Sequence, residues 1–384
     1  MENEPKTRNF RELKEVSEPP SPRDSDAAME FSLLDQATPN LPAIGPDLAL
    51  QAKVSSDRSI AREDRLEAYE DIFESEVGDT PMTRARNVER ETGLRQIYLK
   101  FEGGNPTGTQ KDRIAFAQCM DALRRGFDAV TVATCGNFGA AMALSASLAG
   151  LRCIIYIPDG YHTGRIREML AYNAEILRVP GSYEDAVRIS RERAAAQDIY
   201  DANPGGSNVD IQLRAYGEIA YEIYDELRDA PAAVAVPVSN GTTLAGIHRG
   251  FVSLYRRGKT SRMPRFFAGS SYRKNPIVYA FRKNLLQCWD LKPTLIRETH
   301  INEPLINWHS IDGDLALEAL RQTNGFAADA SDKIMLNNAR MLREREGLTV
   351  LPASTAGLAA FLERAQHEKF PGDRYVAILT GRKS

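Results

Sequence analysis

Hydrophobic and polar positions follow two alternating periods along most of the chain. Apolar runs of strand length lie at residues 96–102, 129–134, 152–158, 174–180, 232–239, 265–271 and 375–381. Segments with helical spacing lie at residues 62–75, 112–126, 137–151, 164–174, 183–197, 211–227, 242–258, 333–347 and 354–368. Because strands alternate with helices, the pattern predicts an α/β fold with mostly parallel sheets covered by helices on both faces.

The first part of the chain lacks this patterning. Residues 1 to about 60 are rich in proline and charge, as in SEPPSPRDSD, and we expect a partly disordered arm over residues 1–70 with one short helix near residues 10–16. The remaining length is too great for one small domain and fits two lobes.

Composition and charge exclude several function classes. Hydrophobic residues make up 42% of the 384-residue chain and charged residues 26%, as in soluble globular proteins. The net charge of −3 argues against nucleic-acid binding, and no apolar run is long enough for a membrane span. The charged N-terminus has no signal-peptide core, so we expect a cytoplasmic protein. The four cysteines form no CxxC pair, which leaves no zinc motif and predicts no metal site.

The segment FEGGNPTGTQKDR, residues 101–113, contains several turn-forming residues shortly before one lysine. Asn105 to Gly108 form a constrained turn that places Lys111 in the first turn of the next helix. The helix dipole and the nearby Arg113 are expected to lower the pKa of the Lys111 amine, and a neutral amine can bond to an aldehyde. A solvated lysine in a plain loop is the alternative interpretation of this segment alone.

Three further strand ends carry polar turns. In VATCGNFGAA, residues 132–141, the turn before the helix suits a carboxylate, and Asn137 either donates its amide or caps the helix. In VSNGTTLAG, backbone amides and two hydroxyls meet at a helix N-terminus, which suits a phosphate. In YVAILTG, Thr380 ends a core strand, where catalytic residues of open α/β sheets gather. Each signal is weak by itself.

Together these segments resemble one family. KFEGGNPTGTQKDR, TCGNFGAA, PVSNGTTLAG and ILTG match in type and order the landmarks of fold type II pyridoxal-phosphate enzymes, with threonine synthase the nearest resemblance. The match runs from about residue 79 to the C-terminus. It implies pyridoxal 5'-phosphate as cofactor, with residues 71–110 and 205–384 in a large lobe and residues 111–204 in a small lobe.

The resemblance also implies roles for single residues. Lys111 takes the place of the Schiff-base lysine, and Asn137 that of the asparagine beside the phenolic oxygen of the cofactor. Thr380 takes the place of the hydroxyl that faces the pyridine nitrogen. The substrate-carboxylate loop corresponds to Thr134, Cys135, Gly136, Asn137 and Phe138, and the cofactor-phosphate loop to Ser239, Asn240, Gly241, Thr242 and Thr243.

The chain departs from the threonine synthase pattern at positions that concern the substrate. Gln212 stands where these enzymes commonly have an arginine for the substrate phosphate, although Arg214 follows two residues later, and Leu351 replaces a family glutamate. The pair Arg273–Lys274 and the loop residues His162 and Arg165 are either substrate-facing or surface groups. These departures put O-phosphohomoserine in doubt as the substrate.

A neutral hydroxyl at the pyridine nitrogen favours elimination or replacement over transamination. The expected function is therefore β- or γ-elimination or replacement on a small amino acid with a leaving group, with Lys111 as proton shuttle. ETHINEPLINW also resembles cysteate synthase, so β-replacement on O-phosphoserine is one alternative, and a cofactor-binding protein without turnover is another. Such a family member is expected to be a homodimer.

Overall fold

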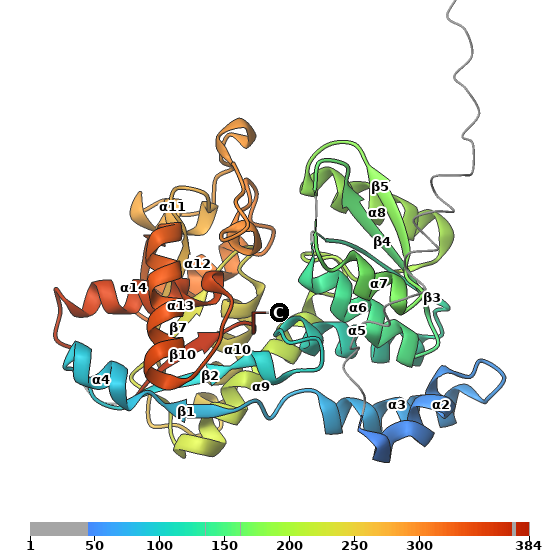
Figure 1. Ribbon diagram of the computed structural model, residues 1–384, viewed down its shortest axis with the longest axis horizontal. Coiled ribbons are helices and arrows are strands. Elements are labelled where there is room, and N and C mark those ends of the chain that lie inside the picture. The colour runs from blue at the N-terminus through green and yellow to red at the C-terminus, as the bar shows by residue number, and fades with distance from the viewer. Residues whose placement is uncertain (1–44, 135, 162, 371–373, 384) are drawn as a thin grey trace, which may run out of the picture. The chain divides into compact units, whose positions relative to one another are not determined.

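The computed structural model describes residues 45–134, 136–161, 163–370 and 374–383. These residues belong to one compact unit with two β-sheets (Figure 1). The α-helices are α2 (Ala49–Ser56), α3 (Arg62–Glu76), α4 (Arg86–Thr92), α5 (Lys111–Arg125), α6 (Asn137–Leu148), α7 (Ile166–Ala171), α8 (Tyr183–Gln197), α9 (Val209–Leu227), α10 (Thr242–Arg256), α11 (Pro276–Arg282), α12 (Gly313–Gln322), α13 (Asp332–Glu346) and α14 (Ala356–Ala365).

The larger sheet has six strands in the order β1-β2-β10-β7-β8-β9. All neighbours are parallel except β1 and β2, and Tyr375 at the start of β10 lies opposite Ile97 of β2. Its strands are β1 (Met82–Arg84), β2 (Ile97–Phe101), β7 (Ala233–Pro237), β8 (Arg265–Ser271), β9 (Phe326–Ala330) and β10 (Tyr375–Leu379).

The smaller sheet has four parallel strands in the order β5-β4-β3-β6. They are β3 (Ala129–Ala133), β4 (Arg152–Pro158), β5 (Glu175–Val179) and β6 (Tyr200–Asp201). The predicted α/β class with mostly parallel sheets is confirmed.

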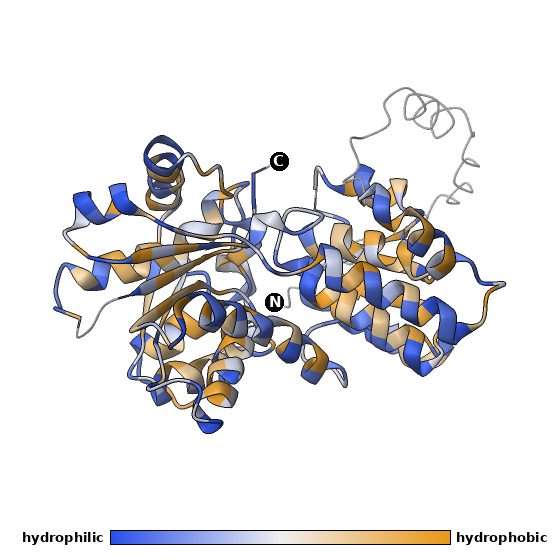
Figure 2. Cartoon of the chain, turned by 90° about the horizontal axis from the view of Figure 1, so that it is seen from below, coloured by the Kyte–Doolittle hydropathy of each residue, from blue (hydrophilic) through white to orange (hydrophobic). Residues whose placement is uncertain are grey.

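Successive residues of each central strand belong to different core clusters. In β3, Val130 and Val132 pack with α5 and α6, whereas Ala129 and Ala133 pack on the side of α8. In β10, Val376 and Ile378 join the first of these clusters, and the alternate residues pack with Phe361 of α14. Both faces of the sheets are therefore buried, as their nearly continuous apolar sequences predict, and Figure 2 shows these strands as largely hydrophobic.

Part of the expected N-terminal arm is folded against the rest of the protein. The side chain of Ser55 donates to the Leu148 carbonyl at 2.7 Å, and Arg65 donates to the Ala149 carbonyl at 2.7 Å. These bonds tie α2 and α3 to the end of α6. The helix expected near residues 10–16 lies outside the described residues, and the assignment of chain segments to two lobes stays a prediction.

The described residues also form short 3-10 helices at Pro46–Leu48, Glu102–Gly104, Pro293–Leu295, Glu303–Leu305 and Pro352–Thr355. Within the described ranges, no helix has both the length and the hydrophobicity of a membrane span. The same ranges hold no group of three or more His, Cys, Asp or Glu side chains suited to a metal ion.

Candidate active site

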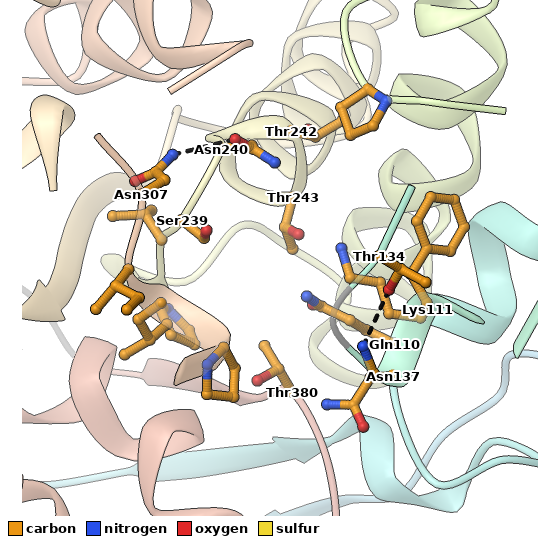
Figure 3. Close-up of a pocket in the computed structure, with 18 of the residues that line it drawn as sticks. Gln110, Lys111, Thr134, Asn137, Ser239, Asn240, Thr242, Thr243, Asn307 and Thr380 are labelled. Carbon is orange, nitrogen blue, oxygen red and sulfur yellow. Dashed lines mark hydrogen bonds between the residues drawn. The ribbon is translucent and has the colours of Figure 1, made fainter. Parts of the chain in front are cut away.

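The predicted site residues line one pocket where strands of both sheets end and helices begin. It has a cavity volume of about 160 Å³ (Figure 3). Strands β3, β7 and β10 lead into it, and the first residues of α5, α6 and α10 line it. The predicted residues found in its wall are Lys111, Thr134, Gly136, Asn137, Phe138, Ser239, Asn240, Gly241, Thr242, Thr243 and Thr380. Cys135 lies outside the described residues.

The turn before Lys111 is held by its own side chains. The Asn105 amide donates to the Glu102 carbonyl at 2.9 Å and accepts from the Gly78 N–H at 3.0 Å. The Asp112 carboxylate accepts from the Thr107 N–H at 2.9 Å and from its hydroxyl at 2.8 Å. Gly108 has a φ of 84°, which other residues rarely adopt. These contacts explain why the sequence places so many turn residues ahead of one lysine.

The turn is also joined to the end of β10. The Gln110 N–H donates to the Thr380 carbonyl at 3.0 Å, and Thr109 forms an isolated β-bridge with Gly381. Lys111 and Thr380 are therefore fixed relative to each other although they lie far apart in the sequence.

The Lys111 amine has no hydrogen bond or ion pair with any residue in the described ranges. Its Nζ lies over the rings of Phe138, 5.4 Å from the centroid, and Tyr216, 5.9 Å from the centroid. Burial lowers the pKa of Lys111 to about 8, partly opposed by the Asp312 carboxylate. An amine in such surroundings is neutral much more often than a lysine in water.

The expected direction of this pKa shift is confirmed, but part of the expected cause is wrong. Arg113 does not face Lys111 as a free charge, because its guanidinium pairs with Glu102 at 2.6 Å and Glu222 at 2.6 Å. Burial lowers the pKa of Lys111 instead, and burial cannot be read from the local sequence pattern.

Asn137 is the first residue of α6, and its amide is oriented by an arginine. The Arg165 guanidinium donates to Asn137 Oδ1 at 2.8 Å and to the Thr107 carbonyl at 2.8 Å. Because arginine only donates, Asn137 must turn its oxygen to Arg165, which leaves its NH₂ group for the pocket, as Figure 3 shows. The alternative of a side-chain cap is wrong, since the N-cap residue is Gly136.

The loop from Ser239 to Thr243 is held in place by contacts with Asp312. Gly241 has a φ of 97°, and an added Cβ there would lie 2.7 Å from the Asp312 carbonyl oxygen. The Thr242 hydroxyl donates to Asp312 Oδ2 at 2.5 Å. The donors that this loop turns to the pocket are therefore the N–H groups of the first turn of α10 and the Thr243 hydroxyl.

Thr380 directly follows β10 in the pocket wall. Its Oγ1 lies 3.1 Å from the Ser354 Oγ, within hydrogen-bond distance. The pocket thus presents one amine, one amide NH₂ group, a helix N-terminus and a neutral hydroxyl, each on a different element.

Several other sequence candidates lie outside the pocket wall. Gln212 is buried and donates its amide to the carbonyls of Ala202 and Asn203. Arg214 is exposed and lines a separate groove, with Glu218. His162 lies outside the described residues.

The pocket also contains residues that the motifs did not single out, namely Tyr161, Tyr183, Glu303 and Asn307. Glu303 and Asn307 belong to the segment that resembles cysteate synthase, so that resemblance was the available signal. Tyr161 lies in the loop after β4 and Tyr183 is the first residue of α8, and neither belongs to a recognisable motif.

Comparison with known proteins identifies the family. The model of the family described as "Pyridoxal-phosphate dependent enzyme" matches residues 73–381. The chain is 31% identical over 311 residues to a threonine synthase of Methanocaldococcus jannaschii, covering 79% of this chain and 74% of that one. It is 32% identical over 306 residues to a threonine synthase of Bacillus sp. (strain ULM1), covering 79% and 82%.

The fold agrees with solved structures of this kind. The structure of maize serine racemase matches with a TM-score of 0.69 at 19% identity, over 83% of this chain and 92% of that one. The resemblance, the fold type II architecture and the cofactor expected from the sequence are all confirmed. The chain belongs to the family of pyridoxal-phosphate-dependent enzymes.

Proposed function

We propose that the protein catalyses elimination or replacement at Cβ or Cγ of a small amino acid that carries a leaving group. One observation supports this proposal above the others: the Lys111 amine lies without a hydrogen-bond or ion-pair partner among the described residues, in the pocket that gathers the other predicted groups. The relatives named threonine synthase make the same class of chemistry the first one to test.

The residues of the pocket fit pyridoxal phosphate. Lys111 offers a neutral amine for its aldehyde, and the first turn of α10 offers N–H groups for its phosphate. The free NH₂ group of Asn137 suits its ring oxygen. The Thr380 hydroxyl suits its ring nitrogen without adding a charge.

When bound, pyridoxal phosphate would supply the electron-withdrawing group that makes the Cα proton of the substrate acidic. Lys111 then accepts the Cα proton, and its lowered pKa suits it both to take and to return a proton near neutral pH. The loop formed by Thr134, Gly136 and Phe138 holds the substrate carboxylate, with Cys135 assigned to the same loop from the sequence. Since Thr380 is neutral, elimination or replacement is favoured over transamination.

The test begins with the attachment site. The protein loaded with pyridoxal phosphate is reduced with borohydride, digested and analysed by mass spectrometry, and the cofactor mass is expected on Lys111. Attachment at another lysine would refute the assignment.

Activity is tested with amino acids that carry a leaving group, namely serine, threonine, O-acetylserine, O-phosphoserine and O-phosphohomoserine, by release of 2-oxo acid, phosphate or acetate. Turnover of at least one compound is expected. Cofactor attachment without any turnover would support the alternative of a binding protein.

The oligomeric state and the location in the cell belong to the same proposal. We expect a homodimer, which sedimentation of the loaded protein tests. A cytoplasmic location is the other expectation, and fractionation of the source cells tests it.

A further inference from the structure

The charges in the pocket wall are few. Among the lining residues that the structure describes, Lys111 is the only cation and Glu303 the only carboxylate. The other lining side chains are hydroxyls, amides, aromatic rings and apolar groups. The cofactor engages the Lys111 amine and the N-terminus of α10, so a second phosphate in the pocket would need a further cation.

The nearby arginines on the small-sheet side are engaged elsewhere. Arg165 donates to Asn137 and Thr107 and forms a two-point ion pair with Glu168, at 3.0 and 2.5 Å. Arg191 donates to the carbonyl of Pro204, a lining residue, and lies 3.4 Å from an Asp201 carboxylate oxygen. Neither arginine belongs to the lining residues of the pocket.

The other cations named from the sequence are also placed away from the pocket. Arg214, the possible substitute for the arginine missing at Gln212, lies in another groove. Lys274 donates to the Arg297 carbonyl, and Arg273 lies over the ring of Tyr272. None of these three cations lines the pocket.

Glu303 gives a further reason to expect that the side chain of the substrate is not anionic. It lines the pocket at the start of the segment Glu303-Pro304-Leu305-Ile306, whose other residues are apolar. Burial, together with the nearby charge of Glu298, raises the pKa of Glu303 to about 7. Near neutral pH this group therefore alternates between a carboxylate, which repels phosphate, and a carboxylic acid, which can donate to a hydroxyl or ester oxygen.

We infer that the substrate side chain carries an uncharged leaving group, a hydroxyl or an acyl ester, and that Glu303 discriminates against a phosphorylated one. This inference rests on the proposed function and narrows it, because it removes phosphate esters from the substrate class.

The test uses matched pairs with the protein loaded with pyridoxal phosphate. O-Acetylserine is compared with O-phosphoserine, and O-acetylhomoserine with O-phosphohomoserine, while serine and threonine distinguish a hydroxyl from an ester. The kcat/KM of the uncharged member is expected to exceed that of its phosphorylated partner by about tenfold or more, since like charges brought together cost over 1 kcal/mol. Equal or higher kcat/KM for the phosphorylated members would overturn the inference.

Failure of the proposed function gives a different result. If no compound is turned over, the proposed reaction is wrong, and the inference is decided by the Kd of each compound from its shift of the visible cofactor band. Weaker binding of the phosphorylated members supports it, and equal or tighter binding overturns it.

Glu303→Gln removes the charge at nearly constant size. The kcat/KM ratio of acetylated to phosphorylated substrate, or the corresponding Kd ratio, is expected to fall at least about threefold. Glu318→Gln, at an exposed carboxylate bonded to Gln322, is the matched control and should keep the wild-type ratio. Glu303→Ala provides a second variant, and the cofactor band shows that each protein is folded. An unchanged ratio in both Glu303 variants would overturn the role of this residue.

Discussion

Lys100 and Lys111 lie on either side of the same turn and have opposite surroundings. Lys100 is 1% exposed, and its amine donates to the Thr80 carbonyl at 2.5 Å and pairs with Glu222 at 2.5 Å. The Lys111 amine contacts aromatic rings and, within the described residues, no acceptor.

The network around Lys100 stabilises charge. Although burial opposes ionisation, hydrogen bonds and charges from Arg113 and Lys100 lower the pKa of Glu222 to about 2. Burial also disfavours the charge of Arg113, but Glu102 and Glu222 raise its pKa above the usual value. Both shifts favour the charged forms of Arg113 and Glu222, and the ion pairs of this network hold the turn in place.

Two lysines of one short segment thus have different surroundings: Lys100 belongs to an ion-pair network, whereas Lys111 lines the pocket. Burial without a carboxylate partner in contact lowers the pKa of the Lys111 amine to about 8, so its neutral form is populated far more near neutral pH than in an ordinary lysine. Lys100 is also buried but is paired with a carboxylate, so burial alone does not distinguish the two lysines.

The largest expected effect comes from removing the reactive amine. Lys111→Ala should lower turnover by at least about 10³-fold, because both the cofactor linkage and the proton acceptor are lost. The free energy of unfolding without cofactor should change by less than about 1 kcal/mol, since among the described residues the amine has no hydrogen-bond or ion-pair partner to leave unpaired. Activity assays and urea titration of the cofactor-free protein measure both. If Lys111→Ala destabilised the protein without lowering its activity, Lys111 would be a supporting residue and the assignment of the two lysines would be wrong.

Lys100→Met should give the opposite result. Removal of its amine leaves Glu222 with Arg113 alone, and we expect a loss of about 3 kcal/mol in the free energy of unfolding. The cofactor band should persist at permissive temperature, because Lys111 is unchanged. Urea titration and the visible spectrum test this, and a variant as stable as the wild type would contradict the support role.

Arg165→Gln tests the residue that orients Asn137. Loss of its charged hydrogen bonds to Asn137 and Thr107 should weaken cofactor binding by about tenfold and shift the visible band, because the Asn137 amide is free to turn. Arg165→Lys should restore part of the affinity. Arg167→Gln, at an exposed neighbour, is the control. Equal losses in Arg165→Gln and Arg167→Gln would refute a specific positioning role.

The smallest effect concerns pH. The amine of Lys111 is reactive when deprotonated, so loading of the cofactor-free protein should accelerate by about fivefold from pH 7 to 8 and level off above the pKa of about 8. An ordinary lysine, with its pKa near 10.4, would continue to gain about tenfold per unit up to pH 10. Stopped-flow measurement of the visible band decides between these profiles, with Lys111→Ala as the background.

The sequence predicted the parts that depend on local chemistry. Turn residues, strand runs and helical spacing are local properties, so the strand ends that carry Lys111, Asn137, Gly241 and Thr380 could be found without coordinates. That these loops belong to one site was implied by the family resemblance, and the structure shows that they follow strands of both sheets.

Weakly patterned elements were not predicted. Strand β9 reads FAADA and has no β-branched residue, and β6 has only two residues, so neither gives a strand signal. Both are defined by pairing with longer neighbours, β8 and β3.

Residue types at short spacing were enough to establish the fold class and the family and to propose Lys111 as the reactive lysine. The environment of Lys111 and the charges around the pocket became known from the three-dimensional structure. Three features involve residues that are distant along the chain: the ion pair of Arg113 with Glu222, the hydrogen bond from Arg165 to Asn137, and the position of Glu303 in the pocket wall. Burial and electrostatic pairing depend on such long-range contacts, and local patterns do not encode them.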